Sequence, residues 1–119
     1  PSGYGVRELA ARLLDASKTE PITVYVEART TRNVTAGLDL LVGRAPRIRL
    51  VEADLAAPAT LAALRRDAAN KAVHVVVGPR SDSVDFRALV ASESGVAERV
   101  EVFERPGGEW AATLFRVRF

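Results

Sequence analysis

The feature that most constrains the fold is the alternation of amphipathic helical stretches with short runs of β-branched residues. Apolar side chains recur every three or four positions over residues 6–17, as on the buried side of a helix. Three later runs, rich in valine and isoleucine, have the length of strands: 21–27, 47–52 and 72–77. Helical stretches separate them at 33–42 and 58–69. Because parallel strands need crossover connections of this kind, the order predicts a parallel sheet with helices on its faces.

The pattern changes in the last quarter of the chain. A short helix is predicted from Ser83, and two strands then follow at 99–104 and 110–119. The turn-rich segment between them has the length of a hairpin connection. Residues 72–77 are almost uninterruptedly apolar, which indicates a strand buried on both faces near the middle of the sheet. We therefore predict one α/β domain spanning residues 1–119.

The predicted architecture is a three-layer, Rossmann-like domain. Its sheet combines three adjacent parallel strands with a C-terminal antiparallel hairpin on one edge. Two residues are expected to set helix ends. Gly43 follows the helical stretch 33–42, at the position where a glycine in the left-handed conformation often ends a helix. Pro58 stands in the first turn of the next helix, where the N–H that proline lacks would have no partner within the helix.

Composition excludes several classes of site. The chain has 119 residues and no cysteine, so it forms neither disulfides nor thiolate zinc sites. His74 is its only histidine, which rules out a histidine-pair metal site, and we predict no metal and no cofactor. Acidic residues are interleaved with the arginines, so the pI near 9.5 does not predict nucleic-acid binding. No apolar run approaches the ~18 residues needed to cross a bilayer.

Polar loops follow each predicted parallel strand, at the edge where open α/β sheets bind ligands. Their guanidinium and hydroxyl groups suit an anion or sugar-phosphate site, whose candidate residues are Arg29, Arg32, Arg80, Ser81 and Asp82. The alternative is that these side chains cap helices and solvate the loops, as they do in many α/β domains. No glycine-rich phosphate loop is present to favour the first interpretation.

No motif for catalysis stands out in the chain. His74 lies inside an apolar strand, where a packed imidazole is more common than a catalytic one. There is no nucleophile-elbow sequence, and the only acids placed for paired-carboxylate chemistry are Glu27, Glu52 and Asp54. We predict no catalytic residue in this chain. The absence of methionine and the start at Pro1 indicate a piece of a longer protein, with Phe119 at its natural end.

Both ends of the chain resemble one family. The opening residues 1–10 (PSGYGVRELA), the segment 102–108 (VFERPGG) and the segment 114–117 (LFRV) are similar to the C-terminal region of bacterial GT-C membrane glycosyltransferases, the dolichyl-phosphate-mannose–protein mannosyltransferase-like proteins. The resemblance implies a non-catalytic domain on the extracytoplasmic face of the cell membrane. It also implies a transmembrane region of the same chain as partner, and a parent enzyme that uses a polyprenyl-phosphate sugar.

Two other functions remain open from the residues themselves. One is a regulatory module that binds a nucleotide or another small ligand at the polar loops. The other is a compact enzyme that uses Glu27, Glu52 or Asp54 together with Arg80.

Overall fold

The computed structural model describes residues 4–28, 32–78, 83–104 and 110–119. The elements alternate as the sequence predicts: α1 (Tyr4–Thr19), β1 (Ile22–Glu27), α2 (Arg32–Val42), β2 (Ile48–Ala53), α3 (Pro58–Asp67), β3 (Val73–Val77), α4 (Ser83–Ser92), β4 (Val96–Glu104) and β5 (Trp110–Arg118).

The strands form one sheet in the order β2-β1-β3-β5-β4. β1 pairs in parallel with both β2 and β3, whereas β5 pairs antiparallel with β3 and with β4. The sheet is thus parallel at one end and antiparallel at the other, as predicted. β3 is its middle strand, and four of its five residues are buried. The near-continuous apolar run therefore identified the central strand correctly.

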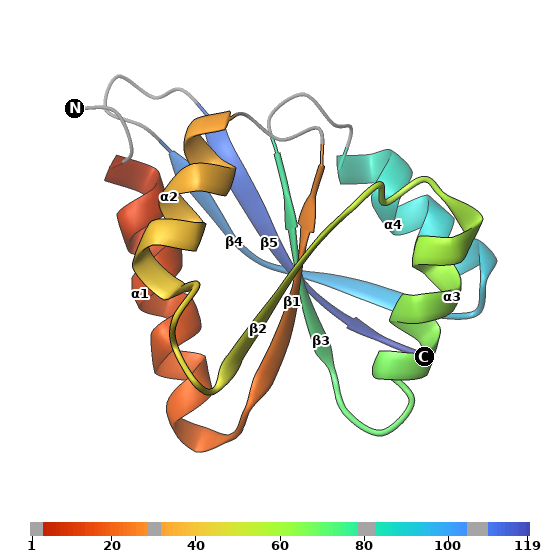
Figure 1. Ribbon diagram of the computed structural model, residues 1–119. Helices are drawn as coiled ribbons and strands as arrows, with labels where there is room; N and C mark the ends of the chain where they lie inside the picture. The colour runs from red at the N-terminus through yellow and green to blue at the C-terminus, as the bar shows by residue number, and fades with distance from the viewer. Residues whose placement is uncertain (1–3, 29–31, 79–82, 105–109) are drawn as a thin grey trace.

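Helices cover both faces of the sheet (Figure 1). α1 and α2 lie on one face, and α3 and α4 lie on the other. Each face has its own hydrophobic core: Leu9 and Leu13 of α1 pack with Val24 of β1, whereas Leu64 of α3 packs with Phe115 of β5. Alternate strand residues enter alternate cores, because successive side chains of a strand point to opposite faces.

The helix ends differ in part from expectation. Pro58 occupies the first turn of α3, as predicted. Gly43 does not take the predicted left-handed conformation. Its N–H instead donates to the carbonyl of Asp39 at 2.9 Å, which continues the hydrogen bonding of α2 past its last residue.

A left-handed stop occurs at the end of α4, on a residue other than glycine. Ser94 has φ 65°. Its N–H donates to the carbonyl of Ala91, and the N–H of Gly95 donates to the carbonyl of Val90, both at 3.0 Å. This is the paired hydrogen bonding of a Schellman motif, in which glycine usually holds the left-handed position.

Tyr25 joins β1 to the last residue of α3. Its hydroxyl donates to Asp67 Oδ2 at 2.6 Å, and Arg49 of β2 lies 3.6 Å from the same oxygen. Burial, together with this hydrogen bond to a carboxylate, raises the pKa of Tyr25 to about 12. The contact fixes α3 over the parallel half of the sheet.

We predict that Ser94→Gly stabilises the domain by about 0.5–1 kcal/mol, because a Cβ is strained at positive φ. The neighbouring Gly95→Ala should act in the opposite direction, since its Cβ would lie 2.6 Å from Phe119 Cε1 and 2.8 Å from Val90 Cγ1. Urea unfolding of both variants measures the two effects. An unchanged midpoint for Ser94→Gly would contradict the strain.

We also predict that Tyr25→Phe lowers the free energy of unfolding by about 1 kcal/mol, because it removes a hydrogen bond to a carboxylate. Arg49→Gln is the matched control and should cost less than about 0.5 kcal/mol, since the Arg49 side chain is 65% exposed. Ultraviolet titration of the tyrosines supplies a second readout. Tyr25→Phe should remove the component that ionises near pH 12, and its persistence would refute the assignment.

Candidate functional site

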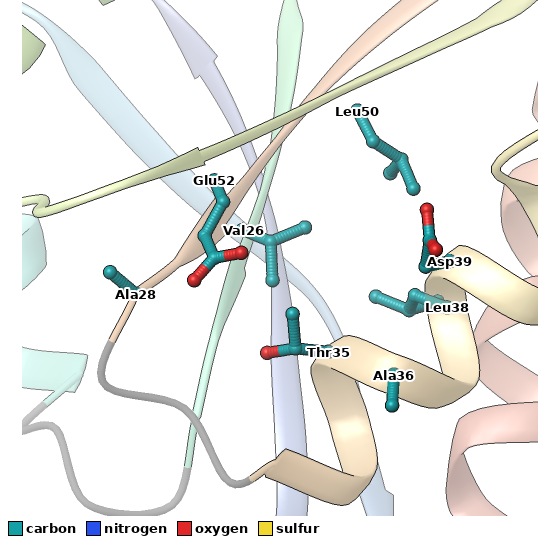
Figure 2. Close-up of a pocket in the computed structure, with 8 residues that line it drawn as sticks. All are labelled: Val26, Ala28, Thr35, Ala36, Leu38, Asp39, Leu50 and Glu52. Atoms are coloured by element: carbon teal, nitrogen blue, oxygen red, sulfur yellow. The ribbon is translucent and has the colours of Figure 1, made fainter.

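An open cleft of about 650 Å³ lies where β1 and β2 approach their carboxyl ends beneath α2 (Figure 2). Its lining comes from these three elements and the residue after β1: Val26, Ala28, Thr35, Ala36, Leu38, Asp39, Leu50 and Glu52. The cleft therefore lies at the end of the parallel strands where α/β sheets commonly bind ligands.

The cleft exists because α2 packs toward α1 and leaves part of β2 uncovered. At their crossing, a Cβ on Gly37 would lie only 2.8 Å from Val6 Cγ1, so a glycine lets the two helices approach closely. β2 is an edge strand, and its side chains on this face become more exposed along the strand. Ile48 is buried, Leu50 is half-buried and Glu52 is exposed.

The cleft has an apolar floor and acidic walls. Val26 and Leu38 are buried beneath it, with Leu50 beside them. Glu52 approaches from β2, and Asp39 approaches from α2 on the other side of the cleft (Figure 2). Among the described lining residues none is basic, so the charge within this part of the cleft is negative.

The predicted anion site falls largely on residues that the structure does not describe. Arg29, Arg80, Ser81 and Asp82 lie outside the described ranges. Arg32 is the first residue of α2, and its side chain is not described. The grouping of these five residues stays a prediction.

The three acids considered for catalysis have different surroundings. Val26 pairs with Glu52 and lines the cleft with it, so the next residue of β1, Glu27, faces the opposite layer, where it is only 4% exposed. Asp54 Oδ1 accepts a hydrogen bond from the N–H of Ala56 at 3.0 Å and shapes the turn before α3. Of these three acids only Glu52 lines the cleft, so the three do not form the paired carboxylates that glycosidic chemistry needs.

Sequence reasoning missed Thr35 and Asp39. Both lie within the helical stretch 33–42, where polar residues are expected to face solvent. A glycine in the middle of that stretch was the one local signal, because such a glycine often marks a close helix contact. The sequence does not reveal which strand such a helix contact would leave partly uncovered.

His74 lies on the α1 side of β3, opposite Val24 on one side and Arg116 on the other. It is half-buried, and its Nδ1 atom has no hydrogen-bond partner among the residues that the structure describes. Burial lowers the pKa of the imidazole, and the guanidinium groups of Arg116 and Arg12 lower it further. Within the described part of the chain, no group of three or more histidine and acidic side chains is placed to hold a metal ion.

The comparisons with known proteins identify no family. No protein-family model and no curated protein matches the chain. Two solved structures from Pyrococcus horikoshii show limited similarity. One is titled a "putative RNA methyltransferase" (10% identity, 98% of this chain and 82% of that chain, TM-score 0.39) and the other a "putative transferase" (12% identity, 97% and 64%, TM-score 0.36). Overlap at this level transfers no function to this protein.

The predicted membership of the GT-C glycosyltransferases is wrong. Neither similar structure is titled a glycosyltransferase, and no family or curated protein supports that assignment. No helix among the described residues is long and apolar enough to cross a bilayer. Sugar transfer and an extracytoplasmic membrane location were implied by the resemblance alone, so they fall with it.

We predict that the domain loses stability as the pH falls below about 6.5, the ordinary pKa of histidine. His74 binds a proton less readily in the folded chain than in the unfolded one. Protonation therefore favours unfolding below the unfolded-state pKa, and the effect levels off below the folded-state pKa. Urea unfolding between pH 7.5 and 5.5 should show this slope, and His74→Gln should flatten it. An equal slope in both proteins would exclude His74 as its source.

Proposed function

We propose that this chain is a ligand-binding domain whose cleft between α2, β1 and β2 holds a small organic cation with an apolar stem. The observation that carries the proposal is the placement of Asp39 and Glu52 on two sides of an apolar floor. An amine or guanidinium suits such a site because it satisfies carboxylates while its methylene groups cover apolar side chains.

Size and position support the same conclusion. A volume of about 650 Å³ lies within the ~300–1,000 Å³ typical of small-molecule sites. We also assign the chain to the three-layer, Rossmann-like class and treat residues 1–119 as one domain. The support for this is the parallel set β2-β1-β3 with helices on both faces.

The acidic walls disfavour phosphorylated ligands in this cleft. A phosphate between Asp39 and Glu52 would meet like charges without a basic partner among the described lining residues. This separates the proposal from a nucleotide module, which would require the opposite charge.

The expected affinity is modest. Both carboxylates lie on exposed residues, and an exposed ion pair contributes about 0.2–1 kcal/mol. The methylene groups of the ligand that lie on the apolar floor add to the binding free energy, by roughly 0.8 kcal/mol for each CH₂ that is fully buried. Together with the entropic cost of association, these contributions give a dissociation constant on the order of 1 mM for a simple diamine.

We predict that 1,5-diaminopentane binds the cleft and shifts the backbone amide NMR signals of Ala28, Thr35 and Ala36. Glu52→Gln and Asp39→Asn should each weaken binding about two- to five-fold, because each removes one exposed charge partner. Glu93→Gln is the matched control, since Glu93 is an exposed acid at the end of α4, away from the cleft. The Glu93→Gln variant should bind 1,5-diaminopentane with the same affinity as the unmodified chain.

The charge of the ligand provides a second control. Pentan-1-ol keeps the apolar stem without the charge, and pentanoate reverses the charge, so both should bind more weakly than the diamine. Signal shifts confined to residues outside the cleft would contradict the proposal. The proposal would also be contradicted if the Asp39→Asn/Glu52→Gln double variant bound 1,5-diaminopentane with the affinity of the unmodified chain.

A further inference from the structure

A second groove, of about 530 Å³, lies between α1 and the opposite end of the sheet. Unlike the acidic cleft, it has charged side chains of both signs, three arginines and three acids, together with His74. Its lining residues are Arg12, Asp15, Ala16, Thr19, Glu20, Ile22, His74, Glu98, Arg99, Val100, Leu114 and Arg116. The sequence analysis did not single out this region as a site.

Four nitrogen-bearing side chains line this groove, and three of them, Arg12, His74 and Arg116, interact electrostatically with one another at the imidazole. His74 and Arg116 are direct cross-strand partners, so both side chains rise from the same face of the sheet. Arg12 reaches the groove from α1, and its ion pair with Glu101 is long, at 3.6 Å, between half-exposed side chains. A guanidinium held this loosely is available to another acceptor.

Two of the three acids of the groove also have cationic partners outside it, in contacts that are as long and as exposed as that between Arg12 and Glu101. Asp15 pairs with Lys18 at 3.7 Å, and Glu98 pairs with Arg118 at 3.6 Å. Neither Lys18 nor Arg118 lines the groove. Within the described residues Arg116 has no ion pair, and Glu20 is the one acid of the groove that also lacks one.

The unpartnered nitrogen of His74 is an independent sign that this position is not optimised for stability. A buried polar atom without a hydrogen bond destabilises the fold, and the other four residues of β3 are all valine. Residues that break the local sequence pattern and lower the stability of the fold are often functional.

We propose that this groove binds a small oxyanion such as phosphate through Arg12, Arg116 and His74. The guanidinium groups would supply paired N–H donors to the oxygens, and the imidazole would contribute a further donor. The site is separate from the acidic cleft and does not depend on the function proposed for it.

The electrostatics at the imidazole support the same conclusion. Arg116 and Arg12 both disfavour protonation of His74, whereas Glu20 favours it with a smaller effect. The titratable groups that line the groove around His74 are Arg12 and Asp15 of α1, Glu20 of the following turn, Glu98 and Arg99 of β4, and Arg116 of β5. A bound anion would offset the two arginines and raise the pKa of His74.

The test is a pH titration of the imidazole proton signals by NMR, with and without 20 mM inorganic phosphate. Because the chain has one histidine, the signals need no assignment. Sodium chloride keeps the ionic strength constant, so general screening does not imitate binding. Phosphate should raise the pKa of His74, and Arg116→Gln or Arg12→Gln should weaken phosphate binding about tenfold.

Two controls separate a built site from general charge attraction. Arg87→Gln removes an exposed arginine of α4, on the other face of the sheet, and should leave the phosphate effect unchanged. Acetate at equal ionic strength should shift the pKa of His74 less than phosphate does. The proposal is overturned if phosphate leaves the His74 titration unchanged, if acetate acts equally, or if Arg116→Gln and Arg12→Gln respond as Arg87→Gln does.

Discussion

The structure depends on the burial of β3 on both of its faces. Val75 and Val77 pack into the core beneath α3 and α4, whereas Val76 packs into the core beneath α1 and α2. The same strand joins the parallel half of the sheet, through β1, to the antiparallel half, through β5. The two hydrophobic cores and the two halves of the sheet therefore meet at the five residues of β3. This explains why valine fills every position of β3 except 74.

The position of β3 also determines where the helices lie. The chain leaves β1 toward β2 in one direction and later crosses from β2 back over β1 to reach β3. Because parallel crossovers are right-handed, connections running in opposite directions place their helices on opposite faces. α2 and α3 thus lie on opposite faces, and α1 lies on the same face as α2 (Figure 1). Once α2 packs against α1 through Gly37, the edge strand β2 is left partly uncovered, and the acidic cleft follows from that arrangement.

The elements and their order were predictable because their signals are local. A helix shows its periodicity within a dozen residues, and the apolar run 72–77 identified the central strand without any knowledge of its neighbours. The left-handed residue was not predictable in the same way. Gly43 has the residue type of a helix stop, yet Ser94 holds the left-handed conformation, and the next residue, Gly95, lies where Phe119 and Val90 leave no room for a Cβ.

The candidate sites were less predictable because they depend on how distant elements pack. Asp39 and Glu52 are thirteen positions apart, and they line one cleft only because α2 and β2 lie next to each other in the folded chain. Strand-end position drew attention to Glu52, which lines the cleft, but grouped it with Glu27, which faces the other layer. The resemblance to glycosyltransferases failed for a different reason. It rested on three short segments, 1–10, 102–108 and 114–117, two of which are rich in glycine and proline, residues that recur at turns in unrelated chains because of their backbone conformations.

The acidic cleft and the groove at His74 lie on the same face of the sheet but toward opposite ends of β1. Val26 and Ala28 line the first, and Ile22 lines the second. Four to six residues of extended strand separate these positions by roughly 13–20 Å, which exceeds the Debye length of about 8 Å at physiological ionic strength. Charges at one site are therefore largely screened from the other. Sites of opposite charge preference can share one face of so small a sheet because the buried side chains of α1, α2 and β1 fill the space between them.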